Sequence, residues 1–193
     1  SLEIRGNYIR NSDFQKNANV WHYAALLNKD DFNQCRKELE ELSELQSKQM
    51  SDDKNTYLSS EINKLVWNNM TPLHVAASNG HTDVCKFLID NGADINAINK
   101  QMMTPLHLIV DQILITDDHR LTCITFLNSE NINVNAINKE KDTPLHLAAF
   151  HGHTEICKII LENILKKGEE YINQQNNNED TPLHLAASNG NTD

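Results

Sequence analysis

The segment Thr-Pro-Leu-His-Leu-Ala-Ala-Phe-His-Gly-His at residues 143–153 is one of three closely similar segments in this chain. The others are Thr-Pro-Leu-His-Val-Ala-Ala-Ser-Asn-Gly-His at 71–81 and Thr-Pro-Leu-His-Leu-Ala-Ala-Ser-Asn-Gly-Asn at 181–191. A fourth copy of the leading tetrapeptide occupies 104–107. Repetition at intervals of about 20–50 residues indicates an array of stacked repeats rather than one closed core.

A second landmark fixes the register of these repeats. An asparagine stands eight positions before the threonine of each tetrapeptide, at Asn63, Asn96, Asn135 and Asn173. The connection between repeats therefore has one length, and the length variation falls inside the repeats. We expect the six additional positions of the second full repeat to extend the turn between its helices, around 111–118. The five additional positions of the third full repeat are expected to lengthen its second helix, around 164–168.

The tetrapeptide has the chemistry of a helix start. A threonine at the N-cap accepts a hydrogen bond from a helix N–H group, and proline at the first helical position removes a donor that would have no partner. The leucines are expected to point into the stack, at Leu73, Leu106, Leu145 and Leu183. The alanine pairs that follow keep the first helix thin, and an apolar stripe containing Val84, Leu88, Ile156 and Ile160 is expected on the second helices.

Together these motifs resemble the ankyrin repeat. The resemblance implies an all-α fold, an ankyrin-repeat solenoid of helix-turn-helix units joined by short β-hairpin-like loops. It also implies that the tetrapeptide histidine hydrogen-bonds the adjoining backbone and holds the repeats in register, at His74, His107, His146 and His184.

The expected organisation runs from an irregular arm to an incomplete repeat. A degenerate first repeat is recognised from His22 and Ala24-Ala25, and the amphipathic stretch 30–50 is its lengthened second helix or a docking helix for a partner. The chain opens on Ser1 and stops before the second helix of its last repeat, so we expect a fragment of a longer protein. The predicted units are 1–18 (N-terminal arm), 19–62 (degenerate capping repeat with a long helical insert), 63–95 (repeat), 96–134 (repeat with an inter-helix insert), 135–172 (repeat with an extended second helix) and 173–193 (truncated repeat).

Composition limits the classes of partner. The formal net charge of -10, with no lysine or arginine cluster, argues against non-specific nucleic-acid binding. No apolar run approaches the roughly 20 residues of a membrane span, so no membrane insertion is expected. The four cysteines are scattered, which fits a reducing compartment and a cytoplasmic location, in the host cytosol if the protein is a secreted bacterial effector.

No motif for chemistry is evident. We expect no enzyme activity, no cofactor and no metal site, because nucleophile, phosphate-binding and zinc-ligand patterns are missing from the sequence. His81 and His153 are expected to be structural, whereas His151 is free to face a ligand. The sequence Asp117-Asp118-His119 resembles part of an acid–base group but is expected to be a solvated loop.

Function is therefore expected on the positions that the repeat leaves free. In the ankyrin family these are implied to be the hairpin tips and the exposed face of the first helix, which line one concave side. The predicted partner-binding residues are Val66, Trp67, Asn68, Met70, Ser78, Asn79, Lys100, Gln101, Met103, Asp111, Gln112, Lys139, Glu140, Asp142, Phe150, His151, Asn177, Asn178, Asp180, Ser188 and Asn189.

Trp67 is the first candidate anchor, since aromatic residues are enriched at interfaces. The alternative is that the N-terminal insert covers it. Where the family has glycine at the tip, this chain has Asn69, Met102, Lys141 and Glu179. A left-handed turn is tolerable for asparagine but strained for Met102, which leaves the tip geometry of the second full repeat open.

The leading prediction is a non-catalytic protein-protein interaction module that belongs to a larger intracellular effector, toxin or scaffold. Its composition, rich in Asn, Ile and Lys, suggests an AT-rich genome and an intracellular bacterium. One alternative is the substrate-selecting or autoinhibitory arm of an enzyme whose catalytic domain lies outside this sequence. Another is a structural array that self-associates, which the truncated C-terminal repeat could also cause artificially.

Overall fold

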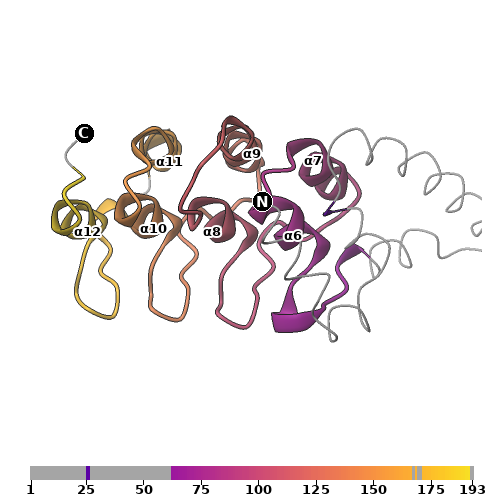
Figure 1. Cartoon of the computed structure of the whole chain (residues 1–193), viewed down its shortest axis with the longest axis horizontal. Coiled ribbons are helices and arrows are strands. Elements are labelled where there is room, and N and C mark those ends of the chain that lie inside the picture. The colour runs from indigo at the N-terminus through magenta and orange to yellow at the C-terminus, as the bar shows by residue number, and fades with distance from the viewer. Residues whose placement is uncertain (1–24, 27–61, 167, 169–170, 192–193) are drawn as a thin grey trace, which may run out of the picture.

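The computed structural model describes residues 25–26, 62–166, 168 and 171–191. All regular elements among these residues are helical, and the α-helices form two rows (Figure 1). This confirms the predicted all-α fold. The first row holds α6 (Pro72–Ser78), α8 (Pro105–Val110), α10 (Pro144–Phe150) and α12 (Pro182–Ser188). The second holds α7 (Thr82–Asp90), α9 (Asp117–Leu127) and α11 (Thr154–Lys166), and the short 3-10 helices η1 (Trp67–Asn69) and η2 (Tyr171–Asn173) lie in the connections.

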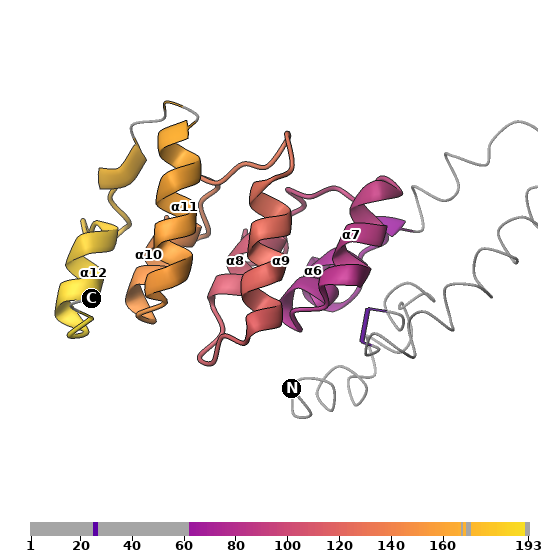
Figure 2. The ribbon, with the colours of Figure 1, turned by 90° about the horizontal axis from the view of Figure 1, so that it is seen from above.

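The helices of each row stack side by side (Figure 2). Helix α8 contacts α6 and α10, α10 contacts α12, and in the second row α9 contacts α7 and α11. The hairpin-like connections project on the side away from the second row (Figure 1). The predicted arm, the capping repeat 19–62 and the amphipathic stretch 30–50 lie outside the described residues, apart from Ala25, Leu26 and Ile62.

Each first-row helix begins as its sequence predicts. Threonine is the N-cap of α6, α8, α10 and α12, proline follows it, and the threonine side chain accepts the backbone N–H of the tetrapeptide histidine. The histidine closes the capping box in the place that glutamate usually takes. In α8, for example, the Thr104 N–H donates to Nδ1 of His107 over 3.1 Å.

The other ring nitrogen of this histidine joins neighbouring repeats. Because Nδ1 accepts a hydrogen bond, the ring proton lies on Nε2, which donates to a backbone carbonyl of the next hairpin. The three bonds run from His74 to Met103 O, from His107 to Asp142 O and from His146 to Asp180 O, each over 3.1 Å. The role that the resemblance implied is confirmed for His74, His107 and His146, whereas His184 makes only its local cap within the described part of the chain.

The register asparagine forms a second joint between repeats. Asn63 donates from Nδ2 to Gly92 O over 3.0 Å and accepts from the Asp94 N–H over 2.8 Å. Asn96 repeats both bonds one unit later, with Asn131 O and with the N–H of Asn133. The constant spacing of this residue in the sequence therefore has a direct structural cause.

The core runs along the array between the two rows. Leu73, Leu106 and Leu145 are buried, as are Val84 and Ile156 of the second row. Leu183 departs from the prediction, because its side chain is 76% exposed. It lies on α12, the last helix of the described array, whose far side carries no further described helix (Figure 1).

The two expected insertions are accommodated differently. Helix α11 has 13 residues against 9 in α7, so the third full repeat does lengthen its second helix. In the second full repeat the additional residues are not all in the turn, which corrects the prediction. They are shared between the turn at 111–116, the 11-residue helix α9 and the connection after it. Thr116 determines this division, because its side chain caps α9 and starts the helix there.

The hairpin tips adopt the left-handed conformation at the four positions where the family has glycine. The φ angles are 57° at Asn69, 59° at Met102, 61° at Lys141 and 64° at Glu179. The question left open for Met102 is thus answered: the tip keeps its geometry with a side chain that disfavours it. For L-residues this conformation costs about 1–2 kcal/mol.

Glycine at one of these tips is expected to stabilise the protein. Lys141→Gly should raise the free energy of unfolding by about 0.5–1 kcal/mol, since the relieved strain exceeds the added freedom of the unfolded chain. Lys139→Gly, at a position of the same hairpin where φ is not positive, should lower it by a similar amount. Urea unfolding followed by circular dichroism measures both, and equal effects of the two variants would contradict the strain argument.

Candidate functional site

Most of the predicted hairpin residues are exposed, but three predicted site residues are not. Val66, Met70 and Ser78 are buried, which removes them from a surface that a partner could contact directly. Val66 and Met70 close the first hairpin, where the Val66 N–H donates to Met70 O over 2.9 Å. Ser78 donates to Val75 O over 3.0 Å within α6. Their side chains serve the fold, and the prediction for them is corrected.

Backbone hydrogen bonds place the remaining tips in one row. The Lys100 N–H donates to Asn68 O over 2.8 Å, and the Lys139 N–H donates to Gln101 O over 3.0 Å. The third bond of the series runs from the Asn177 N–H to Glu140 O over 2.9 Å. Successive tips are therefore held at fixed intervals, which makes them a preorganised surface.

Buried asparagines shape these tips, and the sequence analysis missed them. Asn138 accepts two backbone N–H groups through Oδ1, from Glu140 over 3.0 Å and from Asp142 over 2.8 Å. Asn99 and Asn176 do the same in their hairpins. The available signal was their constant position, five residues before the threonine of the next tetrapeptide. In the first described hairpin Val66 takes this place, and there Asn68 also has a positive φ of 59°.

Polar side chains at the ends of the first-row helices are already engaged. Asn79, Gln112 and Asn189 each donate to a carbonyl of their own helix, over 2.7, 2.8 and 2.9 Å. His151 was expected to be free for a ligand, but its Nε2 lies 3.2 Å from a carboxylate oxygen of Asp111. Its ring also meets Phe150 edge-on at 5.1 Å. The prediction that His151 is free is therefore wrong.

Several large apolar side chains are exposed beside this polar framework. Trp67 is 42% exposed and Phe150 is 46% exposed, at the positions predicted for partner contact, while Met103 is only partly exposed. Leu65 and Ile98, about half exposed, were missed. Both stand six residues before a tetrapeptide threonine, and that shared position was the signal that could have found them.

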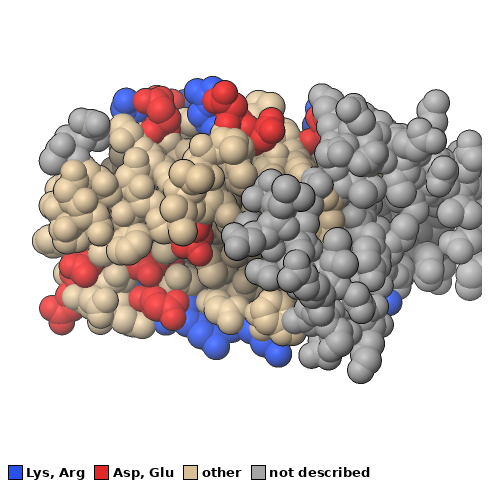
Figure 3. All heavy atoms as spheres, viewed as in Figure 1, with Lys and Arg blue, Asp and Glu red and all other residues tan. Residues whose placement is uncertain are grey.

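Charge changes sign along the hairpins. The hairpin at 99–103 carries Lys100, the next carries lysines and acidic residues, and that at 176–180 carries Glu179 and Asp180. Figure 3 shows acidic side chains over the hairpins toward the C-terminal end and lysines along the lower edge nearer the middle. A partner that runs along the tips meets a gradient rather than a uniform field.

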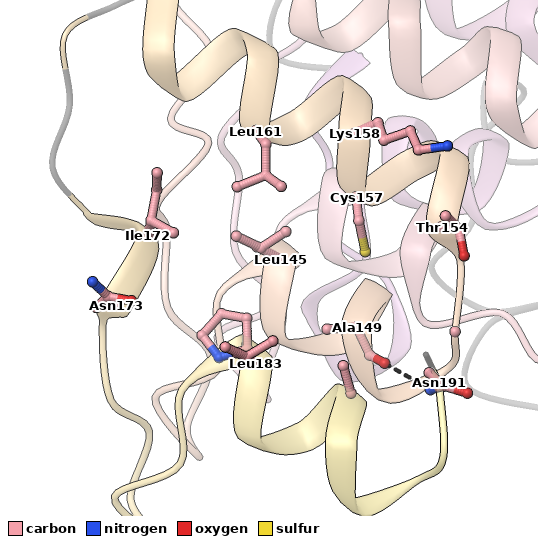
Figure 4. A pocket seen from close by; sticks show the side chains of 13 residues that line it. Leu145, Ala149, Thr154, Cys157, Lys158, Leu161, Ile172, Asn173, Leu183 and Asn191 are labelled. Carbon is pink, nitrogen blue, oxygen red and sulfur yellow. Dashed lines mark hydrogen bonds between the residues drawn. The ribbon is translucent and has the colours of Figure 1, made fainter. Parts of the chain in front are cut away.

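A groove of about 320 Å³ lies between α10, α11 and α12. Figure 4 shows Leu145, Leu161, Ile172 and Leu183 around it, with Asn191 at one side donating to Ala149 O over 2.9 Å. The lining is mostly apolar and carries no cluster of acid and base groups that would indicate catalysis.

The titratable residues that are buried serve the packing. Burial lowers the pKa of His74 and of His107 to about 4, and it also lowers the pKa of His119, His146 and His153. Burial likewise raises the pKa of the Cys123 thiol to about 12, and thiols of this kind are poor nucleophiles at neutral pH. The described residues hold no group of three or more His, Cys, Asp or Glu side chains that could bind a metal ion.

Three described histidines outside the tetrapeptides pair with carbonyls of the preceding repeat. His81 contacts Ala25 O at 3.0 Å, His153 contacts Gln112 O at 2.7 Å, and His119 contacts Ser78 O at 3.3 Å. The structural role predicted for His81 and His153 is confirmed. Asp117 and Asp118 form the first turn of α9 and His119 is buried, so the predicted solvated loop at 117–119 is corrected. His119 also leaves no room for a side chain at Gly80, because a Cβ there would lie 2.9 Å from the His119 ring.

Comparison with known proteins agrees with this architecture. A family model described as "Ankyrin repeat" matches residues 68–100, and one described as "Ankyrin repeats (3 copies)" matches residues 114–193. An ankyrin repeat protein of Rickettsia bellii (strain RML369-C) is 60% identical over 37 residues, which are 19% of this chain and 16% of that protein.

Two further relatives come from eukaryotes. Alpha-latrocrustotoxin-Lt1a of Latrodectus tredecimguttatus is 55% identical over 38 residues, 20% of this chain and 3% of that protein. Ankyrin repeat-containing protein P1E11.10 of Schizosaccharomyces pombe is 39% identical over 51 residues, 26% of this chain and 24% of that protein. The matched part is therefore a quarter or less of each relative.

No described helix is both long and apolar enough to cross a bilayer.

Proposed function

Because this chain belongs to the ankyrin-repeat family, we propose that it is a non-catalytic module that binds another protein along its hairpin tips and first-row helices. Stacked repeats of this kind generally provide extended binding surfaces. The observation that carries the proposal is the exposure of two aromatic side chains, Trp67 and Phe150, that have no place in the core. Exposed aromatic residues are the usual anchors of protein interfaces.

The hairpin row supports the same proposal. Its tips are fixed by backbone bonds between repeats and by the buried asparagines Asn99, Asn138 and Asn176. A surface that is ordered before binding loses less conformational entropy when a partner binds. The residues proposed to contact the partner are the exposed members of the predicted set together with Leu65 and Ile98.

We also propose that the array works in the cytoplasm as the targeting part of a larger effector or toxin. The support is the similarity of short segments to an ankyrin repeat protein of Rickettsia bellii and to a latrocrustotoxin. The location of a fluorescent fusion of this chain in a eukaryotic cell tests the cytoplasmic assignment. Determining the flanking sequence tests the assignment to a larger effector or toxin. Accumulation of the fusion outside the cytoplasm would count against the cytoplasmic assignment.

Affinity capture from cytosolic extract, quantified by mass spectrometry, tests the binding surface. The variant Trp67→Ala with Phe150→Ala should lose a captured protein at least about tenfold, because interface anchors contribute roughly 2 kcal/mol or more each. Leu165→Ala, an exposed leucine on α11, is the matched control and should retain it. Both variants are checked for folding by circular dichroism. Equal capture by all three proteins would refute the proposed surface.

A further inference from the structure

The turn between α8 and α9 displays two adjacent aliphatic side chains. Ile113 is 82% exposed and Leu114 is 80% exposed, more than any other large apolar residue in the described part of the chain. The corresponding turns of the neighbouring repeats have the short sequences Asn79-Gly80-His81 and His151-Gly152-His153. The added length of this turn, residues 111–116, therefore brings apolar surface into solvent, where it is unfavourable unless it is used.

The base of this turn is fixed on both sides. Asp111 pairs with His151 at 3.2 Å, and the Gln112 carbonyl lies 2.7 Å from Nε2 of His153. On the far side, Ile115 packs against the core and Thr116 caps α9. Only Ile113 and Leu114 project between these anchors, so the turn presents them with little conformational entropy to lose on binding.

The surroundings of the two residues are acidic. Asp111, Asp117 and Asp118 are exposed. Arg120, a basic residue on the same helix as Asp117, pairs with it at 3.1 Å. An anionic membrane surface would repel these carboxylates. A protein pocket with basic side chains at its rim complements them.

The turn also adjoins the proposed binding surface. His151, which holds Asp111, packs edge-on against Phe150 at 5.1 Å. A partner that covers Phe150 therefore comes close to the turn at 111–116.

We propose that this turn is a docking prong. Ile113 and Leu114 insert into an apolar pocket of a protein partner, and lysine or arginine side chains at the rim of that pocket contact Asp111, Asp117 and Asp118. The inference rests on the proposed protein-binding function but uses residues outside the predicted surface, apart from Asp111. It predicts that the partner has an apolar pocket bordered by lysine or arginine.

Capture from extract tests the prong with the double variant Ile113→Asn, Leu114→Asn and the control Leu165→Asn. The prong variant should lose, at least about tenfold, a protein that the parent and the control both retain. A photoreactive benzophenone side chain placed at position 114 should cross-link that protein within an apolar pocket bordered by lysine or arginine. Capture of that protein should also weaken as salt is raised.

Other outcomes overturn the prong. They are unchanged capture by the double variant, cross-links outside an apolar pocket, or prong-dependent sedimentation of the parent with phosphatidylcholine–phosphatidylserine vesicles. If the variant at Trp67 and Phe150 loses a partner while the prong variant retains it, the prong fails and the proposed function stands. If the parent captures no protein, both fail.

Discussion

Replacement of His107 by alanine is expected to lower the free energy of unfolding by about 3 kcal/mol. The side chain is fully buried and bridges two repeats, from the Thr104 N–H at 3.1 Å to Asp142 O, also at 3.1 Å. Alanine leaves the buried Thr104 N–H and the part-buried Asp142 carbonyl without this partner, at about 1–3 kcal/mol for an unsatisfied buried group. It also leaves a cavity, and losses of this size are typical of broken buried networks.

The chain contains its own control for this measurement. His184 caps α12 in the same way, with the Thr181 N–H donating to Nδ1 over 3.2 Å, but its side chain is exposed. His184→Ala removes the local cap without removing a bond between described repeats, so it should cost only about 1 kcal/mol. Urea unfolding at neutral pH compares the two. Equal losses would mean that capping, and not the joint between repeats, gives the histidine its importance.

Stability is expected to fall as the pH is lowered from about 6.5 to about 4. Burial holds the pKa of His74 and His107 at about 4 in the folded protein, against an ordinary value of 6.5. Between these values the unfolded chain binds more protons than the folded one, so acid favours unfolding. The contribution of each buried neutral histidine to the free energy of unfolding is fully present above pH 6.5. It is lost as the pH falls through this window and is on the order of 3 kcal/mol for each histidine.

A comparison of variants isolates this contribution from that of the carboxylates. His107→Gln removes one titrating group, so its unfolding free energy should fall less steeply between pH 6.5 and pH 4 than that of the parent. Urea unfolding at several pH values gives both curves. If the curves run parallel, protonation of His107 does not drive the acid sensitivity.

The sequence predicted the local structure well because its strongest signals are local. Thr-Pro-Leu-His determines a cap, a first turn and a buried leucine within four residues, and these appear at α6, α8 and α10. The role of the histidine across repeats was also correct, but it came from resemblance to a family. At α12 the same tetrapeptide begins a helix while Leu183 stays exposed, since burial needs a neighbouring helix as well as a motif.

The site was predicted less completely, because the residues that were predicted wrongly are determined by contacts between repeats. The pairing of His151 with Asp111 joins residues 40 positions apart, and no local pattern indicates it. Ser78 occupies a position that is exposed in α12, as Ser188, yet the neighbouring layers cover it. By contrast, the tip-forming asparagines and the exposed Leu65 and Ile98 recur at fixed distances from the threonine. A column-by-column comparison of the repeats would have found them.

The joints described above also determine how this array carries a mechanical load. Each repeat is tied to the next by the histidine bond, the tip-to-tip bond and the packing of adjacent helices. Tension applied between the two ends therefore passes through these joints in series, like the links of a chain, and the weakest joint sets the rupture force. Extension should proceed in discrete steps, one repeat at a time, while the repeats still stacked keep their tips in register.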